Sequence, residues 1–295
     1  MTVRNNRSPL RHSRETPAAP ERQPEAPNDD EAQPLGHEAP EIVADAATIG
    51  GKRLRRSALG DAVTALIGGM SVSFGAVAMA WASASLGGRA GASPAHLVGA
   101  LAFPVGFIIL LVGKSELFTE NFLLPVIGVF ERRGSLRELG QLWGGTLIAN
   151  LIGVFVFALL ISRPGVLAPA PARVLVDLAV SKVTTPLGTS FVQAIFAGWV
   201  MTLLTWLLLA AGSSGPRLAI IWAMGSLIIL GEFNHTIISA AEIFMALLLG
   251  APITVGDWLV RNFLPALVGN ILGGVVFVTL LTYLQAHFDR QQTSP

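Results

Sequence analysis

Apolar residues occur in long stretches from about residue 58 to near the C-terminus, and short polar segments separate them. A helix needs about 20 consecutive apolar residues to cross the hydrocarbon core of a bilayer. Six stretches reach this length: 60–86, 97–128, 139–162, 188–211, 218–249 and 263–286. The pattern therefore predicts an all-α integral membrane protein with six transmembrane helices.

The second and fifth stretches are each 32 residues long, and each contains a polar interruption. Lys114, Glu116 and Glu120 lie in the second stretch, and Glu232 and His235 lie in the fifth. A charged side chain at the bilayer centre costs at least about 2.5 kcal/mol on insertion scales. Irregular backbone at membrane depth is tolerated where it is buried in protein or lines a water-filled cavity. We therefore predict that both helices are broken and that their polar loops surround a narrow passage.

Two similar segments, 147–153 and 267–273, place Asn150 and Asn270 120 residues apart. Three predicted crossings separate the copies, so the copies run in opposite directions. Inverted repeats of this kind are typical of channels and transporters. The sequence therefore predicts two inverted three-helix repeats, in which Asn150 and Asn270 satisfy broken backbone or bridge helices.

Composition supports a membrane body and adds a polar tail. Hydrophobic residues make up 52% of the chain and charged residues 13%, with a mean hydropathy of +0.60, whereas charged residues make up about 25% of a typical soluble domain. Residues 1–50 are rich in Pro, Glu, Arg, Asp and Ala, which is typical of disorder. We predict a disordered cytoplasmic tail (1–56), a transmembrane domain (57–288) and a short cytoplasmic C-terminal tail (289–295).

Lys and Arg in the short loops set the expected orientation, because cytoplasmic loops carry an excess of them. With the N-terminus inside, the inner flanks hold nine of these residues and the outer loops five. The inner set is Lys52, Arg53, Arg55, Arg56, Arg132, Arg133, Arg137, Arg217 and Arg290, and the outer set is Arg89, Arg163, Arg173, Lys182 and Arg261. We therefore place the chain in the cytoplasmic (inner) membrane with both termini in the cytoplasm.

Several classes of function lack the residues they need. The chain has no cysteine, which removes disulfides and a thiol nucleophile, and no basic stripe with interleaved aromatics indicates nucleic-acid binding. An intramembrane enzyme could use His235 with Glu232 or Glu242 as acid and base, but no HExxH motif, supported Ser-His pair or phosphate loop accompanies them. We expect no enzyme activity, no cofactor and no metal.

Four ordered motifs resemble the formate/nitrite transporter family. Glu116-Leu117-Phe118-Thr119 with Asn121 is similar to the family's helix-interrupting loop in the second span, and Asn150-Leu151-Ile152-Gly153 to its third-span motif. The segment around Phe233 and His235 resembles the central-histidine motif, and residues 262–274 resemble the sixth-span signature. The likeness covers roughly residues 55–287.

The resemblance implies an aquaporin-like protomer, a homopentamer with one pore per protomer, and passage of small monovalent anions such as formate, nitrite or hydrosulfide. By the same resemblance, Leu117, Phe118 and Thr119 form the cytoplasmic-side constriction and gating loop. His235 faces the middle of the pore, and Lys182 matches an electropositive vestibule lysine.

The chain departs from the family pattern around the presumed pathway. Asn234 stands where the family usually has Glu before the central His, while Glu232 lies two residues earlier, and Ser239 replaces the usual Asn. Lys114 and Glu120 stand where small residues are usual, and Thr202 stands where an Asn is expected in the fourth span. These changes leave the specific substrate open, along with the choice between channel-like and proton-coupled passage.

As a mechanism we expect Lys182 and the half-helix N-termini to attract the anion, and His235 and Thr119 to supply hydrogen-bond donors or a proton at the centre. Phe118 and Phe74 are expected to exclude water and hydrated cations. We expect five residues to support the loops: Asn150, Asn270, Glu116, Asn121 and Glu232. Glu116 is assigned to support rather than to anion binding because a carboxylate repels an anion. The alternative function is a non-conducting or regulatory membrane protein with the same fold.

Overall fold

The computed structural model describes residues 1–2, 36–87 and 93–293. The compact unit that contains the membrane body runs from Leu35 to Pro295. Its helices are, in chain order, α1 (Ala39–Leu54), α2 (Ala58–Ser85), α3 (Ser93–Ala102), α4 (Pro104–Val112), α5 (Leu124–Phe130), α6 (Leu136–Ile161), α7 (Pro169–Thr184), α8 (Leu187–Ala210), α9 (Ser214–Leu230), α10 (Thr236–Leu248), α11 (Val255–Asp257), α12 (Leu264–Ile271) and α13 (Leu281–Thr293). A 3₁₀ segment, η1 (Phe118–Phe122), precedes α5, and two π-helical segments, η2 (Trp258–Phe263) and η3 (Leu272–Leu280), flank α12.

Within the described residues, five helical stretches are long and apolar enough to cross a membrane. They are Ala58–Ser85, Pro94–Val112, Leu136–Ile161, Leu187–Ala210 and Val255–Gln291. Three shorter apolar stretches accompany them, Phe118–Phe130, Ser214–Leu230 and Thr236–Leu248. The prediction of an all-helical membrane protein is therefore correct, and the two long apolar runs of the sequence are divided into shorter helices.

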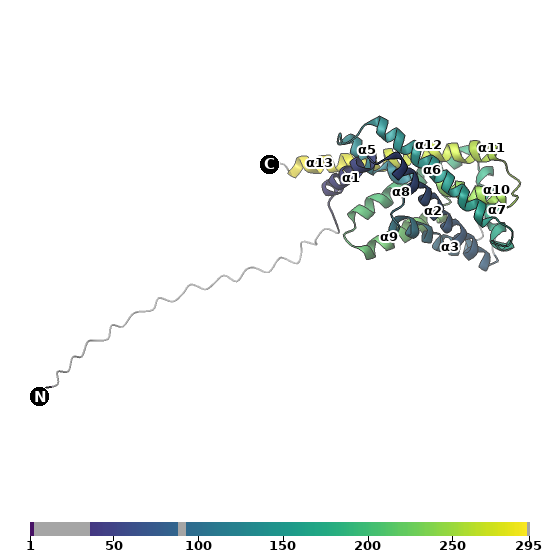
Figure 1. Ribbon diagram of the computed structural model, residues 1–295, viewed down its shortest axis with the longest axis horizontal. Coiled ribbons are helices and arrows are strands. Elements are labelled where there is room, and N and C mark those ends of the chain that lie inside the picture. The colour runs from purple at the N-terminus through teal and green to yellow at the C-terminus, as the bar shows by residue number, and fades with distance from the viewer. Residues whose placement is uncertain (3–35, 88–92, 294–295) are drawn as a thin grey trace. The chain divides into compact units, whose positions relative to one another are not determined.

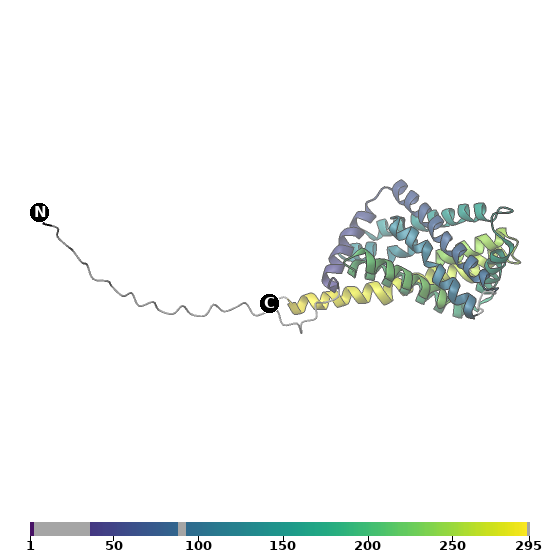
Figure 2. The same cartoon turned by 90° about the horizontal axis from the view of Figure 1, so that it is seen from below.

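The helices form a bundle whose two ends carry different elements (Figure 1). The labels α1, α5 and α13 lie toward one end, and α7, α10 and α11 toward the other. Helix α1 packs against both α5 and α13, and the Arg290 guanidinium donates a hydrogen bond to the Pro40 carbonyl at 3.1 Å. Figure 2 shows the same pairing of α1 with α13 from below. The first and last helices of the described unit therefore lie at the same end.

Helix α1 corrects the predicted extent of the disordered tail. Residues 39–54 form a helix whose apolar face, including Val43 and Ala46, is buried against Leu124 and Ile127. The small residues on this face allow close contact, since a Cβ at Gly50 would overlap the Leu124 carbonyl. The average composition of residues 1–50 conceals this short amphipathic segment. Residues 3–35 of the predicted tail, the outer-loop Arg89 and residues 294–295 lie outside the described residues.

Two interruptions of the backbone have similar geometry. Helix α4 ends at Val112 and residues 113–117 are not helical, while α9 ends at Leu230 and residues 231–235 are not helical. Lys114 (φ 61°) and Glu232 (φ 51°) adopt the left-handed conformation one residue after a glycine in each segment. This conformation is uncommon for residues other than glycine, so both interruptions are held in place by their surroundings.

The helix crossings beside the two interruptions also correspond. Helix α2 crosses α6 where Gly69 faces the Asn150 backbone, and α8 crosses α12 where Gly198 faces the Asn270 backbone. A Cβ at either glycine would overlap the facing carbonyl oxygen. Glycine at these two positions therefore sets the close approach of the helices, which brings each Asn side chain to its interruption.

Candidate functional site

The two interruptions meet at one buried hydrogen bond. Thr119, in η1, and His235, at the N-terminal end of α10, have no exposed surface, and Thr119 Oγ1 lies 2.9 Å from His235 Nε2. His235 Nδ1 accepts hydrogen bonds from the backbone N–H groups of Ile237 and Ile238, both at 3.2 Å. The hydrogen of a neutral His235 ring is therefore on Nε2 and is donated to Thr119 Oγ1. This arrangement leaves the Thr119 hydroxyl hydrogen available to another acceptor.

Asn150 and Asn270 hold the backbone of the two interruptions in the same way. Asn150 Oδ1 accepts from the Phe118 N–H at 2.8 Å, and its Nδ2 donates to the Glu116 carbonyl at 2.9 Å. Asn270 Oδ1 accepts from the Thr236 N–H at 2.9 Å, and its Nδ2 donates to the Asn234 carbonyl at 2.9 Å. Each side chain thus replaces helical hydrogen bonds that the interruption removes.

Apolar side chains surround Thr119. Leu117 has no exposed surface and Phe118 is 2% exposed. The Phe118 ring packs edge-on against Phe122 and Trp143, with ring centroids 4.9 Å and 6.0 Å away. Leu117, Phe118 and Thr119, here called the plug, are buried together in this conformation, with the hydroxyl of Thr119 as the polar group.

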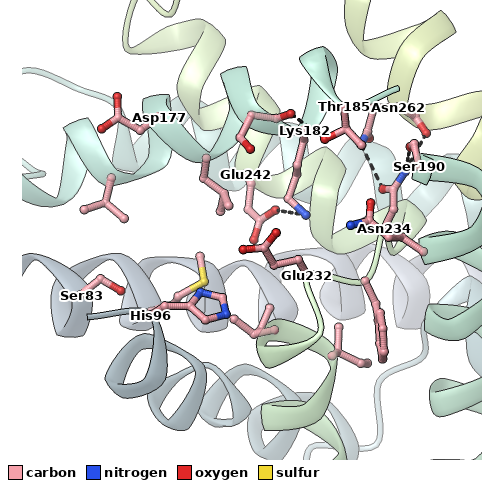
Figure 3. A pocket seen from close by; sticks show the side chains of 18 residues that line it. Ser83, His96, Asp177, Lys182, Thr185, Ser190, Glu232, Asn234, Glu242 and Asn262 are labelled. Atoms are coloured by element: carbon pink, nitrogen blue, oxygen red, sulfur yellow. Dashed lines mark hydrogen bonds and ion pairs between the residues drawn. The ribbon is translucent and has the colours of Figure 1, made fainter. Parts of the chain in front are cut away.

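A cavity of about 110 Å³, here called cavity 1, lies next to the second interruption (Figure 3). Lys182, from α7, lies inside it, with its Nζ 3.2 Å from Glu242 Oε2 and 3.2 Å from Ser239 Oγ. Glu232 and Asn234 also line this cavity. The predicted vestibule residue Lys182 is therefore present beside the interruption, but a carboxylate already pairs with it.

Asn234 joins three polar side chains beside cavity 1. Its Nδ2 donates to Ser190 Oγ at 2.8 Å, and its Oδ1 accepts from Ser239 Oγ and Asn262 Nδ2, both at 3.0 Å. Asn234 and Ser239 are two of the positions that depart from the family pattern, and they contact each other directly. The two replacements therefore belong to one hydrogen-bond network, which continues through Ser239 to Lys182.

A larger cavity of about 830 Å³, here called cavity 2, lies next to the first interruption. Its lining includes five basic and two acidic side chains. These are Lys52, Arg53, Arg56, Lys114 and Arg217, with Glu116 and Glu120. This excess of basic groups favours anions at the mouth of cavity 2.

Arginines from the first helix and the segment that follows it support the first interruption. Glu116 Oε1 lies 2.8 Å from Arg56 Nη1 and 3.4 Å from Arg53 Nε, and Arg53 Nη1 donates to Asn121 Oδ1 at 2.9 Å. Glu120 is buried, and its Oε2 accepts from the Leu117 N–H at 3.4 Å. Glu116 and Asn121 thus contact Arg53 and Arg56, which entered the sequence analysis only through their effect on orientation.

Comparison with known proteins identifies the family. The family profile described as "Formate/nitrite transporter" matches residues 40–284. The chain belongs to the formate/nitrite transporter family.

Individual members of the formate/nitrite transporter family support this assignment. The chain is 30% identical over 197 residues to "Uncharacterized transporter YrhG" from Bacillus subtilis. The aligned region covers 66% of this chain and 73% of that protein. It is 27% identical over 242 residues to "Inner membrane protein YfdC" from Escherichia coli, covering 81% and 76%. The chain is therefore a multi-pass membrane protein of a transporter family.

Solved structures of the family have the same fold. One described as "FNT family ion channel" matches with a TM-score of 0.75 at 23% identity, covering 83% of this chain and 98% of that one. Another, "Pentameric formate channel with formate bound", matches with a TM-score of 0.64 at 19% identity, covering 77% and 97%.

Phe74 and Thr202, two residues predicted for the pathway, line neither cavity 1 nor cavity 2. The Phe74 ring is 49% exposed and packs edge-on against Phe157, with centroids 4.8 Å apart, and Phe74 lines neither cavity. Thr202 is fully buried, and its hydroxyl donates to the Gly198 carbonyl in its own helix at 2.8 Å. The contact of Phe74 in this conformation is therefore with Phe157, and the Thr202 hydroxyl donates its hydrogen bond to the α8 backbone.

The contacts of the central network were not predicted from the sequence. Glu242 was considered as an acid or base beside His235, Asn262 only as the first residue of the sixth-span motif, and Ser190 was not singled out. Glu242 is seven residues from His235, nearly two turns along α10, but the pairing with Lys182 depends on α7, which the sequence reading treated as a loop. An intramembrane carboxylate requires a partner, and that rule was the available signal.

Proposed function

We propose that this protein is a channel or transporter for small monovalent weak-acid anions of the formate or nitrite kind. The observation that carries the proposal is the Thr119–His235 hydrogen bond of 2.9 Å, buried at the meeting point of two interrupted helices with cavity 1 and cavity 2 beside them. The family description supports the substrate class.

The proposed topology has six crossings in two inverted halves. Helices α3 and α4 continue through the first interruption into η1 and α5 as the second crossing, and α9 continues into α10 as the fifth. The matching contacts of Asn150 and Asn270 support the inverted repeat. We propose that cavity 2, on the side of α1 and α13, faces the cytoplasm, so that both termini are cytoplasmic. A homopentamer is proposed from the likeness to a pentameric formate channel.

The proposed mechanism uses hydrogen-bond donors in an apolar passage. A bare anion in hydrocarbon faces a barrier of tens of kcal/mol, and the closed plug of Leu117 and Phe118 excludes hydrated ions. The His235 ring donates to Thr119 Oγ1, so the Thr119 hydroxyl hydrogen is available for an anion that displaces the plug. His235 Nδ1 already accepts two backbone hydrogen bonds. We therefore propose that His235 orients Thr119 and donates from Nε2, rather than accepting a proton at Nδ1.

The alternative is a non-conducting or regulatory membrane protein with the same fold. Complete burial of Leu117, Thr119 and His235 favours it, because no open path crosses the plug in this conformation. Flux measurement on the purified protein separates the two functions.

The test is formate and nitrite flux in proteoliposomes containing wild type, Thr119→Ala and Thr119→Ser. We expect flux in the wild type, a loss of about tenfold or more in Thr119→Ala, since a hydrogen bond to a charged group contributes about 1.5–3 kcal/mol, and near wild-type flux in Thr119→Ser, which keeps the hydroxyl. No wild-type flux of any small weak-acid anion would refute transport. Equal flux in Thr119→Ala and wild type would refute the role of Thr119.

A further inference from the structure

The charges around cavity 1 do not suit a simple anion vestibule. Lys182 is the one Lys or Arg among the described residues that line it, whereas Glu242, Glu232 and Asp177 also line it. Figure 3 shows Glu242 joined to the Lys182 ammonium and Glu232 beside this pair. An anion that binds Lys182 therefore meets a carboxylate already in place.

Glu242 is enclosed at this position. It has no exposed surface, its Oε2 lies 3.2 Å from Lys182 Nζ, and its Oε1 has no hydrogen-bond partner among the described residues. Removing the partner of a buried ion pair leaves an uncompensated charge, which is strongly unfavourable. Glu242 can therefore lose the Lys182 ammonium to another anion only if its own charge is neutralised.

We propose that Glu242 takes up one proton when an anion from cavity 1 binds Lys182, so that anion binding and proton binding are coupled one to one. The inference rests on the proposed function and specifies its regulation and substrate form. The proton comes from a hydronium ion in the cavity water, which leaves a neutral water, and it forms an O–H bond on the Glu242 carboxyl. The anion replaces the carboxylate as the partner of Lys182 Nζ, and the charge of the site is the same before and after. When the anion leaves Lys182 for the plug, Glu242 returns the proton to it and pairs with Lys182 again.

The other ionisable groups around cavity 1 are poor substitutes for Glu242. Glu232 and Asp177 are exposed, and His96, from α3, is only partly buried. The described lining residues from α2, α8 and η2 are uncharged: Met79, Ser83, Ser190, Gln193 and Asn262. Water can hydrate the exposed carboxylates, so anion binding at Lys182 does not force them to take up a proton.

The coupling predicts different behaviour from the two sides. The excess of basic groups at cavity 2 attracts an anion without a proton. From cavity 1, the anion binds together with a proton, and its apparent affinity falls by about tenfold per pH unit once Glu242 is mainly ionised, because linked binding is reciprocal. The accepted species from that side is therefore equivalent to the undissociated acid.

The test measures the ratio of protons to formate that enter proteoliposomes, using radiolabelled formate outside and a pH-sensitive dye inside. Wild type, Glu242→Gln and the matched control Asp177→Asn, which removes one exposed carboxylate of the same cavity, are compared. We expect about one proton per formate in the wild type and in Asp177→Asn. We expect formate flux with little accompanying proton in Glu242→Gln, because the amide leaves Lys182 free and carries no titratable group.

The outcomes separate this inference from the proposed function. Absence of wild-type formate flux refutes the proposed function. Wild-type flux with a ratio near zero, or an unchanged ratio in Glu242→Gln, overturns the coupling while transport stands. Infrared difference spectra of the full-length protein with and without nitrite provide a readout independent of flux. A new protonated-carboxyl band that shifts in Glu242→Asp supports the coupling, and absence of any such band in wild type overturns it.

Discussion

Replacing Asn150 by Ala should destabilise the fold through one interruption of the backbone. The side chain satisfies the Phe118 N–H and the Glu116 carbonyl, at 2.8 Å and 2.9 Å, and neither group has another hydrogen-bond partner among the described residues. A buried polar group left without a partner costs about 1–3 kcal/mol. Two such groups predict a loss of about 2–6 kcal/mol in the free energy of unfolding.

The measurement is the free energy of unfolding in mixed detergent micelles, followed by circular dichroism as the denaturing detergent is increased. Thr146→Val is the matched control, because Thr146 lies one turn earlier on α6, is buried, and has a hydroxyl without a hydrogen-bond partner. We expect the control to stay within about 0.5 kcal/mol of the wild type. Equal stability of Asn150→Ala and Thr146→Val would refute the supporting role of Asn150.

Two further predictions test the helix crossings and the plug. Gly198→Val should reduce the yield of folded protein, because a Cβ there overlaps the Asn270 carbonyl. The control Gly144→Ala should fold normally, because a Cβ at Gly144 meets no atom within 4 Å. Equal yields of the two variants in size-exclusion chromatography would contradict the close crossing at Gly198. Phe118→Ala should admit chloride and water that the wild type excludes, because it removes the ring that packs on Phe122 and Trp143 in the plug. Unchanged chloride conductance in planar bilayers would show that Phe118 is not part of the barrier.

The membrane class and the position of the interruptions were predictable because they depend on local sequence. Charged residues within an apolar run must be buried in protein or reach water, and this rule located Lys114, Glu116 and Glu232 in irregular backbone. The matched segments also indicated that Asn150 and Asn270 make corresponding hydrogen bonds, since a polar side chain inside a crossing needs a polar partner.

The remaining features depend on contacts between distant segments. Arg53 and Arg56 meet Glu116 because α1 packs on α5, and the average composition of the first 50 residues concealed that helix. Phe74 was assigned to the passage from the sequence, but its contact with Phe157 depends on the crossing of α2 with α6. Glu242 could be identified as a partner of Lys182 only after α7 had been placed against α10.

The central claim is that the Thr119–His235 contact separates two aqueous cavities that open on opposite sides of the membrane. The chain has no cysteine, so single cysteines at Lys114 in cavity 2 and Asp177 in cavity 1 can be introduced without altering other positions. A membrane-impermeant thiol reagent is applied to right-side-out and inside-out vesicles. The account predicts labelling of Asp177→Cys only from outside and of Lys114→Cys only from inside. Labelling of both cysteines from the same side would contradict it.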